Sequence, residues 1–300
     1  MSPQNKKVIV IAGPTAVGKT AIAITIAKHF QTEIISADSR QCFKELNIGV
    51  ARPSEKELMQ VKHHFIASHS IHDEVNAASF ETYALRKAGE LFEGHDVIVM
   101  VGGTGLYIKA FCEGLDEIPP VKLEIRNNII SKFEKNGLGW LQEEIKLKDP
   151  VFYEKGEIQN PQRMMRALEV IESTGKSVLQ FRSGKKRGRE FSIIKIGLEL
   201  SKEELHKRIE MRTDEMVKNK LVDEVSSLQQ FSRLNALQTV GYSEIFDYIA
   251  GKLTLEQAIS NMKINTRQYA KRQITWFKKD KNIRWHSPAE IDSIISMAGA

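Results

Sequence analysis

The segment at residues 13–20, GPTAVGKT, restricts the possible folds of this chain more than any other feature. It matches the pattern G-x-x-x-x-G-K-[ST] without a gap. Residues 8–12 form an apolar run typical of a buried strand, and the Ala- and Ile-rich residues 21–30 predict a helix. A glycine loop between a strand and a helix directs backbone N–H groups and a helix N-terminus toward a phosphate. The alternative is a glycine turn that binds nothing, and the flanking pattern favours phosphate binding.

The loop residues differ in what they contribute to a phosphate site. Lys19 is expected to neutralise charge on the terminal phosphates, and the Thr20 hydroxyl is a candidate ligand for Mg²⁺. We expect the whole loop to surround the phosphate: Gly13, Pro14, Thr15, Ala16, Val17, Gly18, Lys19 and Thr20. The loop alone leaves open whether the phosphate is transferred or departs as a leaving group.

Apolar runs recur along the chain and are separated by helical segments. Beyond residues 8–12 they lie at 33–37, 97–101, 192–199 and 283–286. This alternation predicts an α/β fold, a parallel sheet with helices on both faces. The helical stretches exceed what simple crossovers need, so at least one forms an added layer or insertion. The expected parts are a phosphate-loop core at 1–120, a helical insertion with a basic loop at 121–190, a core strand and Arg-bearing helix at 191–212, a helical region at 213–261, and a C-terminal helix with the last strand at 262–300.

Asp38 directly follows the predicted strand at 33–37. Ligands of open parallel sheets sit at the carboxyl ends of the strands, so Asp38 is expected beside the phosphate loop. An Asx turn or a helix cap is the structural alternative. The strand at 97–101 runs into Gly102-Gly103 and ends without the carboxylate that holds Mg²⁺ in NTPases, which weakens a motor or switch NTPase interpretation.

The charge of the chain points to a polyanionic partner. The net charge is +6, and basic residues crowd the segments 163–189 and 263–281. A basic run is usually a solvated face, but with two such runs in a chain that has a phosphate loop, a polyanionic partner has equal weight. Cys42 and Cys112 have no paired spacing, and no stretch is long enough to cross a membrane, so we expect a reduced cytosolic protein.

Arg208 and Arg212 lie four residues apart in a predicted helix that begins after Ser201. They therefore share a face and are candidates for contacts with phosphate. The alternative is a surface ion pair, because Glu204 precedes Arg208 by one turn.

Several segments, taken in order, resemble the tRNA isopentenyltransferase family over nearly the whole chain. They are GPTAVGKT at 13–20, SADSRQ at 36–41, NIGVARP at 47–53, HHFI at 63–66, VGGTGLY at 101–107, NPQRMMRALEV at 160–170, VGY at 240–242 and TRQYAKRQITWF at 266–277. Many families share the phosphate loop, whereas the combination of the other segments is specific. The chain departs from the family pattern at Val50, where a Thr is common, and at Gln238-Thr239, where an Arg or Cys often precedes VGY.

The resemblance implies a P-loop-kinase-like core with a helical insertion. It implies transfer of a dimethylallyl group from dimethylallyl diphosphate to N6 of the adenine 3′ to the anticodon, in tRNAs that read codons starting with U. Mg²⁺ is then the cofactor, Asp38 the general base and Thr20 a diphosphate contact. From the chemistry of the leaving group, we expect Lys19, Arg208 and Arg212 to assist. The region 213–261 is expected to contact the tRNA anticodon arm, and we expect a monomer. The expected tRNA contacts are Asp38, Ser39, Arg40, Gln41, Thr104, Arg126, Gln162, Arg163, Met164, Met165, Arg166, Gly241, Tyr242, Arg267, Lys271 and Arg272.

The chemistry of these residues is consistent with that reaction. An adenine amine is a poor nucleophile, and a positioned carboxylate that accepts its proton accelerates attack by about 10²–10⁴-fold. A departing diphosphate needs preorganised donors. Two other enzymes share parts of this pattern: a prenyltransferase acting on free AMP or ATP, and a small-molecule P-loop kinase. A nucleic-acid-binding protein with a vestigial loop is a third alternative, against which Lys19, Thr20 and Asp38 argue.

Overall fold

The computed structural model describes residues 6–299, which fold into two compact units. The larger unit combines the described residues up to Glu113 with those from Gly188 onward, and the smaller unit is Gly114–Arg187. The insertion expected at 121–190 therefore corresponds to a unit that begins and ends a few residues earlier. Among the described residues, no helix combines the length and the apolar character needed to cross a membrane.

The larger unit contains a six-stranded sheet in which every pairing is parallel, in the order β3-β2-β4-β1-β5-β6. The strands are β1 (Lys7–Ala12), β2 (Ile34–Ser36), β3 (His63–His64), β4 (Val97–Gly102), β5 (Ser192–Leu198) and β6 (Arg284–His286). The expected α/β class is confirmed. The sheet has one more strand than the sequence predicted, because β3 is too short to show an apolar pattern.

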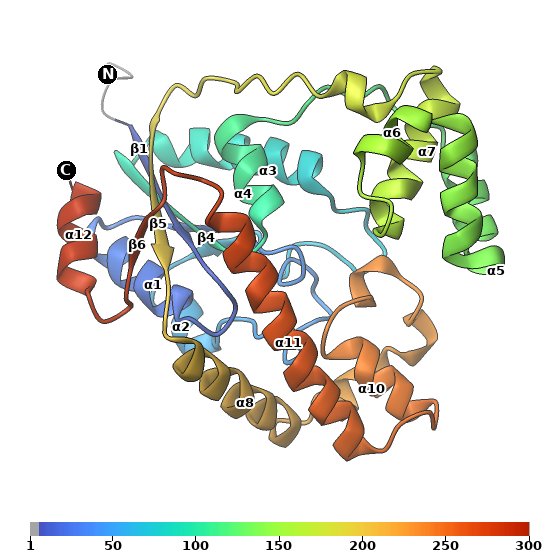
Figure 1. The fold of residues 1–300 in the computed structure, drawn as a ribbon. Coiled ribbons are helices and arrows are strands. Elements are labelled where there is room, and N and C mark those ends of the chain that lie inside the picture. The colour runs from blue at the N-terminus through green and yellow to red at the C-terminus, as the bar shows by residue number, and fades with distance from the viewer. Residues whose placement is uncertain (1–5, 300) are drawn as a thin grey trace. The chain divides into compact units, whose positions relative to one another are not determined.

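The central strand β1 is buried on both faces, as its unbroken apolar run requires. Val8 and Val10 belong to one hydrophobic cluster, together with residues of α3 (Ala77–Phe92) and α4 (Gly105–Glu113). Ile9 and Ile11 belong to a second cluster with α1 (Lys19–His29) and α12 (Ile291–Gly299). Figure 1 shows these helix pairs on opposite faces of the sheet.

The remaining helices of the larger unit follow β2 and β5. They are α2 (Glu55–Leu58), α8 (Lys202–Lys218), α9 (Leu221–Ser227), α10 (Tyr242–Ile249) and α11 (Leu255–Phe277), with short 3₁₀ turns η3 (Gln229–Phe231) and η4 (Asn235–Leu237). The boundaries expected at 212/213 and 261/262 fall inside α8 and α11. Helix α11 begins earlier than expected because Thr254 and Gln257 form a capping box.

The smaller unit is helical and has its own core. It contains α5 (Leu123–Lys148), which is interrupted at Gly137, and then α6 (Pro150–Lys155), α7 (Pro161–Thr174) and the 3₁₀ turn η2 (Val178–Phe181). Asn160 caps α7 through a bond from the Arg163 N–H, and Pro161 occupies the first helical position, where its missing N–H costs nothing. Met164 and Met165 are buried in this core.

Candidate active site

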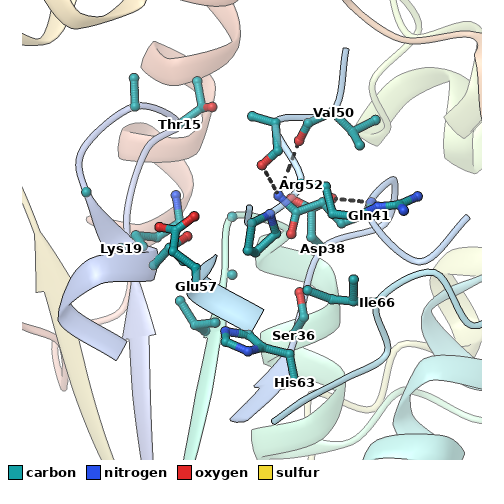
Figure 2. A pocket seen from close by; sticks show the side chains of 18 of the residues that line it. Thr15, Lys19, Ser36, Asp38, Gln41, Val50, Arg52, Glu57, His63 and Ile66 are labelled. Carbon is teal, nitrogen blue, oxygen red and sulfur yellow. Dashed lines mark hydrogen bonds between the residues drawn. The ribbon is translucent and has the colours of Figure 1, made fainter. Parts of the chain in front are cut away.

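A cavity of about 320 Å³ opens at the carboxyl ends of β1, β2 and β4. Five of the eight loop residues line it: Thr15, Ala16, Gly18, Lys19 and Thr20. Figure 2 shows Thr15 and Lys19 on one side of this cavity and Asp38 on another. Gly13, Pro14 and Val17 shape the loop without lining the cavity, and the Val17 side chain belongs to the core.

The loop backbone explains why glycines stand at its two ends. Gly13 has a φ of +148°, and a Cβ there would lie 2.7 Å from the Leu198 carbonyl oxygen of β5. Gly18 has a φ of +101°, in the region that favours glycine. Lys19 Nζ donates to the Pro14 carbonyl over 2.7 Å, so the ammonium group is held within the loop. The pKa of Lys19 is lowered to about 8: burial is the main cause, Asp38 opposes it, and Arg212 adds to the lowering.

Asp38 forms the Asx turn that was the structural alternative, and it also lines the cavity. Its Oδ1 accepts bonds from the Arg40 N–H over 2.8 Å and from the Gln41 N–H over 3.1 Å. No hydrogen bond to Oδ2 is present among residues 6–299, so this oxygen is available to a ligand. The turn therefore orients the carboxylate that lies in the cavity wall.

A second cavity, of about 520 Å³, adjoins the first. Six residues line both cavities: Thr15, Asp38, Val50, Ala51, Arg212 and Tyr269. The second cavity is also lined by residues of the 39–49 segment, of α8, of the 238–244 segment and of α11, including Arg40, Gly241 and Arg272. Asp38 thus stands at the boundary between a phosphate-loop cavity and a cavity with a basic rim.

The two arginines of α8 have different environments. Arg212 lines both cavities and donates to the Thr15 hydroxyl over 2.6 Å. Arg208 lines neither cavity; it pairs with Glu204 over 2.7 Å and donates to the Val17 carbonyl over 3.3 Å. The ion pair of the alternative is present at Arg208, whereas the walls of both cavities include Arg212. Burial lowers the pKa of Arg212, and Asp38 opposes that change.

The glycine turn after β4 is packed against protein, so these glycines permit close approach of neighbouring groups. A Cβ on Gly102 would overlap Ala37, and one on Gly105 would overlap the Trp276 ring. Gln273 of α11 bridges this turn to the phosphate loop: its Nε2 donates to the Gly103 carbonyl over 2.9 Å, and its Oε1 accepts from the Thr15 N–H over 2.8 Å. Sequence reasoning gave Gln273 no role.

The expected RNA contacts of the larger unit differ in their surroundings. Ser39, Arg40, Gly241 and Arg272 line the second cavity, and Gln41 lines the first. Thr104 and Arg267 make protein contacts, because the Thr104 hydroxyl accepts from the Ser39 N–H and Arg267 pairs with Glu210, while Lys271 is exposed. Tyr242 is fully buried, which corrects the expected contact of its side chain with RNA.

In the smaller unit, only some of the expected tRNA contacts on helix α7 are exposed. Gln162 and Arg163 are exposed, whereas Met164 and Met165 are buried and their side chains face the core. Arg126 and Arg166 approach Glu169, over 3.9 and 3.0 Å, and Arg163 pairs with Glu157. The basic side chains of this unit are therefore partly exposed and partly held by carboxylates.

Comparisons with known proteins agree on one family. A family model described as IPP transferase matches residues 41–280. The tRNA dimethylallyltransferase of Christiangramia forsetii is 50% identical over 92% of this chain and 91% of its own length. The corresponding protein of Cytophaga hutchinsonii is 46% identical over 100% of this chain and 99% of its own length.

Solved structures give the same result. The full-length tRNA isopentenylpyrophosphate transferase of Bacillus halodurans is 32% identical, with a TM-score of 0.71, over 98% of this chain and 96% of that chain. A eukaryotic dimethylallyltransferase, described as acting on tRNA, is 25% identical with a TM-score of 0.76, over 98% of this chain and 77% of that chain. The chain belongs to the IPP transferase family.

Proposed function

We propose that this protein transfers a dimethylallyl group from dimethylallyl diphosphate to N6 of the adenine 3′ to the anticodon, in tRNAs that read codons starting with U, and releases diphosphate. The observation that carries the proposal is the position of Asp38 between the two cavities. One cavity has the phosphate loop that a diphosphate requires. The other has Arg40 and Arg272 in its wall, which suits an RNA base and the phosphates that flank it.

The diphosphate is assigned to the cavity of the phosphate loop. Negative charge grows on the diphosphate as the allylic carbon–oxygen bond breaks, so fixed donors accelerate that step. Lys19, the loop N–H groups and the Arg212 guanidinium supply such donors. Their positions are fixed before substrate binds, because Lys19 bonds to Pro14 and Arg212 bonds to Thr15.

The adenine is assigned to the second cavity, where N6 reaches Asp38. The target base leaves its stack to enter the cavity, at a cost of a few kcal/mol. As N6 attacks the allylic carbon, Asp38 Oδ2 accepts the proton that the amine loses. Arg40 and Arg272 in the wall of this cavity favour the phosphates that flank the base.

Mg²⁺ fits the donors of the first cavity. Mg²⁺ prefers oxygen ligands and is often held by one or two protein groups plus substrate phosphates. The Thr20 hydroxyl lies in the cavity wall and would hold the ion, with the diphosphate supplying further oxygens. Among the described residues, no cluster of three or more His, Cys, Asp or Glu forms a dedicated metal site. When bound, the ion neutralises charge on the diphosphate.

The remaining partner assignments follow from the same proposal. The tRNA anticodon arm is the macromolecular partner, held through its phosphates by the basic side chains of each unit. The protein is proposed to act in the cytosol, in agreement with its two unpaired buried cysteines, and we propose that it acts as a monomer.

Two alternative acceptors are distinguished by one experiment. Labelled dimethylallyl diphosphate is incubated with the enzyme and Mg²⁺, with unmodified tRNA, AMP or ATP as the acceptor. The proposal expects label in tRNA at the adenine 3′ to the anticodon and none in the free nucleotides. Labelling of AMP alone would identify a free-nucleotide prenyltransferase. Mg²⁺-dependent ATP hydrolysis without tRNA, which we expect to be negligible, would identify a kinase-like activity.

A further inference from the structure

The loop at residues 47–51 separates the two cavities. Val50 and Ala51 line both of them, and Gly49 lines the second. The carboxamide of Gln41 donates to the Val50 carbonyl over 3.2 Å and to the Ala51 carbonyl over 2.9 Å, as the dashed lines of Figure 2 show. Ala51 has a φ of +49°, a conformation that costs free energy for a residue with a side chain. Within the loop the Ala51 N–H donates to the Ile48 carbonyl over 3.0 Å, and contacts from outside the loop add to this bond.

Glu224, on α9, supplies these contacts. Its Oε2 accepts from the Ile48 N–H over 2.8 Å, and its Oε1 accepts from the Gly49 N–H over 3.1 Å. The buried Tyr242 hydroxyl donates to the same Oε1 over 2.5 Å. A Cβ on Gly49 would lie 2.5 Å from the Tyr242 ring, so the loop backbone approaches this ring as closely as glycine allows. Burial and Glu224 raise the pKa of Tyr242, which keeps its hydroxyl a donor.

Hydrogen bonds joined by short stretches of covalent chain thus lead from α9 to Asp38. Glu224 accepts from the loop backbone, and the loop carbonyls accept from the Gln41 side chain. The backbone N–H of Gln41 donates to Asp38 Oδ1. Glu224 itself lines neither cavity, so it acts on substrates only through these bonds.

We propose that Glu224 is a positioning residue for the transfer reaction: through the 47–51 loop and Gln41 it orients the Asp38 carboxylate and fixes the wall between the two cavities. The inference rests on the proposed function, because it takes Asp38 as the base. A misplacement of a reacting group by about 1 Å lowers the rate by about 10²-fold, even when its cause lies far from the chemistry.

The test is Glu224→Gln, which keeps the size of the side chain and replaces one acceptor oxygen by an NH₂ group. A carboxylate accepts with both oxygens, whereas a carboxamide accepts only with its single oxygen. In the variant, the NH₂ group therefore faces the N–H of either Ile48 or Gly49, and that N–H loses its acceptor. Tyr242→Phe is the second variant, since it removes only the hydroxyl. Asp247→Asn is the matched control: Asp247 lies on α10 and pairs with exposed Lys252.

The measurement is single-turnover transfer with saturating prenyl diphosphate and tRNA. Its amplitude reports the folded, competent fraction, and its rate constant reports the geometry of the site. We expect Glu224→Gln to lower the rate constant about ten- to hundred-fold, Tyr242→Phe to lower it less, and Asp247→Asn to leave it unchanged, with diphosphate affinity retained in all three. A reduced amplitude with a wild-type rate constant in both loop variants would overturn the inference and show a structural role. Absence of transfer by the wild-type enzyme would instead contradict the proposed function.

Discussion

The Arg212 guanidinium donates a hydrogen bond of 2.6 Å to the hydroxyl of Thr15, so helix α8 directly contacts the phosphate loop. This arrangement places a fixed positive charge at the boundary of both cavities. Loss of one preorganised donor to developing charge typically costs about 10²–10³ in rate. We expect Arg212→Ala to lose about that much in kcat/KM for the prenyl diphosphate, and Arg212→Lys to recover only part because it lacks the planar fork. Steady-state kinetics with tRNA held at saturation measures this.

Arg208 provides the comparison within the same helix. Because it lies outside both cavities and pairs with Glu204, Arg208→Ala should reduce kcat/KM far less than Arg212→Ala. Equal losses in the two variants would show that Arg208 moves to the diphosphate during the reaction.

Lys19 should make diphosphate binding sensitive to pH. Since burial lowers its pKa to about 8, the ammonium form is present below that pH and is lost above it. The affinity of the free enzyme for inorganic diphosphate should therefore decrease as the pH rises through about 8. The measurement is titration calorimetry between pH 6 and pH 10, a range that extends about two pH units on either side of the Lys19 pKa. Lys19→Met should bind inorganic diphosphate weakly at every pH in this range. It should also lack the decrease in affinity near pH 8 that Lys19 causes in the wild type.

Asp38→Asn tests the role of the base. The amide keeps the shape of the carboxylate and removes the proton acceptor, so kcat should decrease by about 10²–10⁴-fold, the usual contribution of a general base. The affinities for diphosphate and tRNA should be unchanged, because the base acts in the transition state. A Mg²⁺ titration separates the alternatives: recovery of activity at high Mg²⁺ would mean that Asp38 anchors the metal ion.

The glycines of the larger unit allow a paired stability test. Gly105→Ala would place a methyl group against the Trp276 ring, and overpacking of this kind costs about 1–3 kcal/mol. Gly89 lies in the last turn of α3, and a Cβ added there would have no neighbouring atom within 4 Å, so Gly89→Ala should stabilise the protein by up to about 0.5–1 kcal/mol, the value for a mid-helix position. Urea unfolding measures both, and destabilisation by Gly89→Ala would contradict the open environment of that position.

Binding of tRNA should weaken steeply as salt rises. Each phosphate contact contributes about 0.9 to the log–log slope for duplex and about 0.7 for single strands. Arg182 and Lys185 are exposed in the basic loop of the smaller unit. Replacing both with Ala should lower the slope by about one such contribution per side chain, measured by filter binding across a salt series. An unchanged slope would place this loop outside the RNA contact.

The local patterns in the sequence were sufficient to predict the parallel sheet, the phosphate loop and the position of Asp38. Each of these features lies within one short segment, where an apolar run is followed by glycine or by a polar turn. The role of Gln273 could not be predicted in this way, because its two partners, Thr15 and Gly103, lie far from it in the chain. The burial of Tyr242 likewise depends on its contact with Gly49, and a tyrosine after a glycine gives no local sign of that contact.

The order of the strands has a consequence for synthesis of the chain on the ribosome. Strand β1 carries the phosphate loop and is made first, but it pairs with β5, where Lys7 lies opposite Ser192. The Thr15 N–H obtains its partner only when Gln273 has been made. Pairing with β4 can form earlier, since Lys7 lies opposite Val97. The nascent chain therefore holds a complete phosphate-loop sequence through most of translation without its contacts to β5 and Gln273, and the cavity of the loop gains these contacts only when nearly the whole protein has been made.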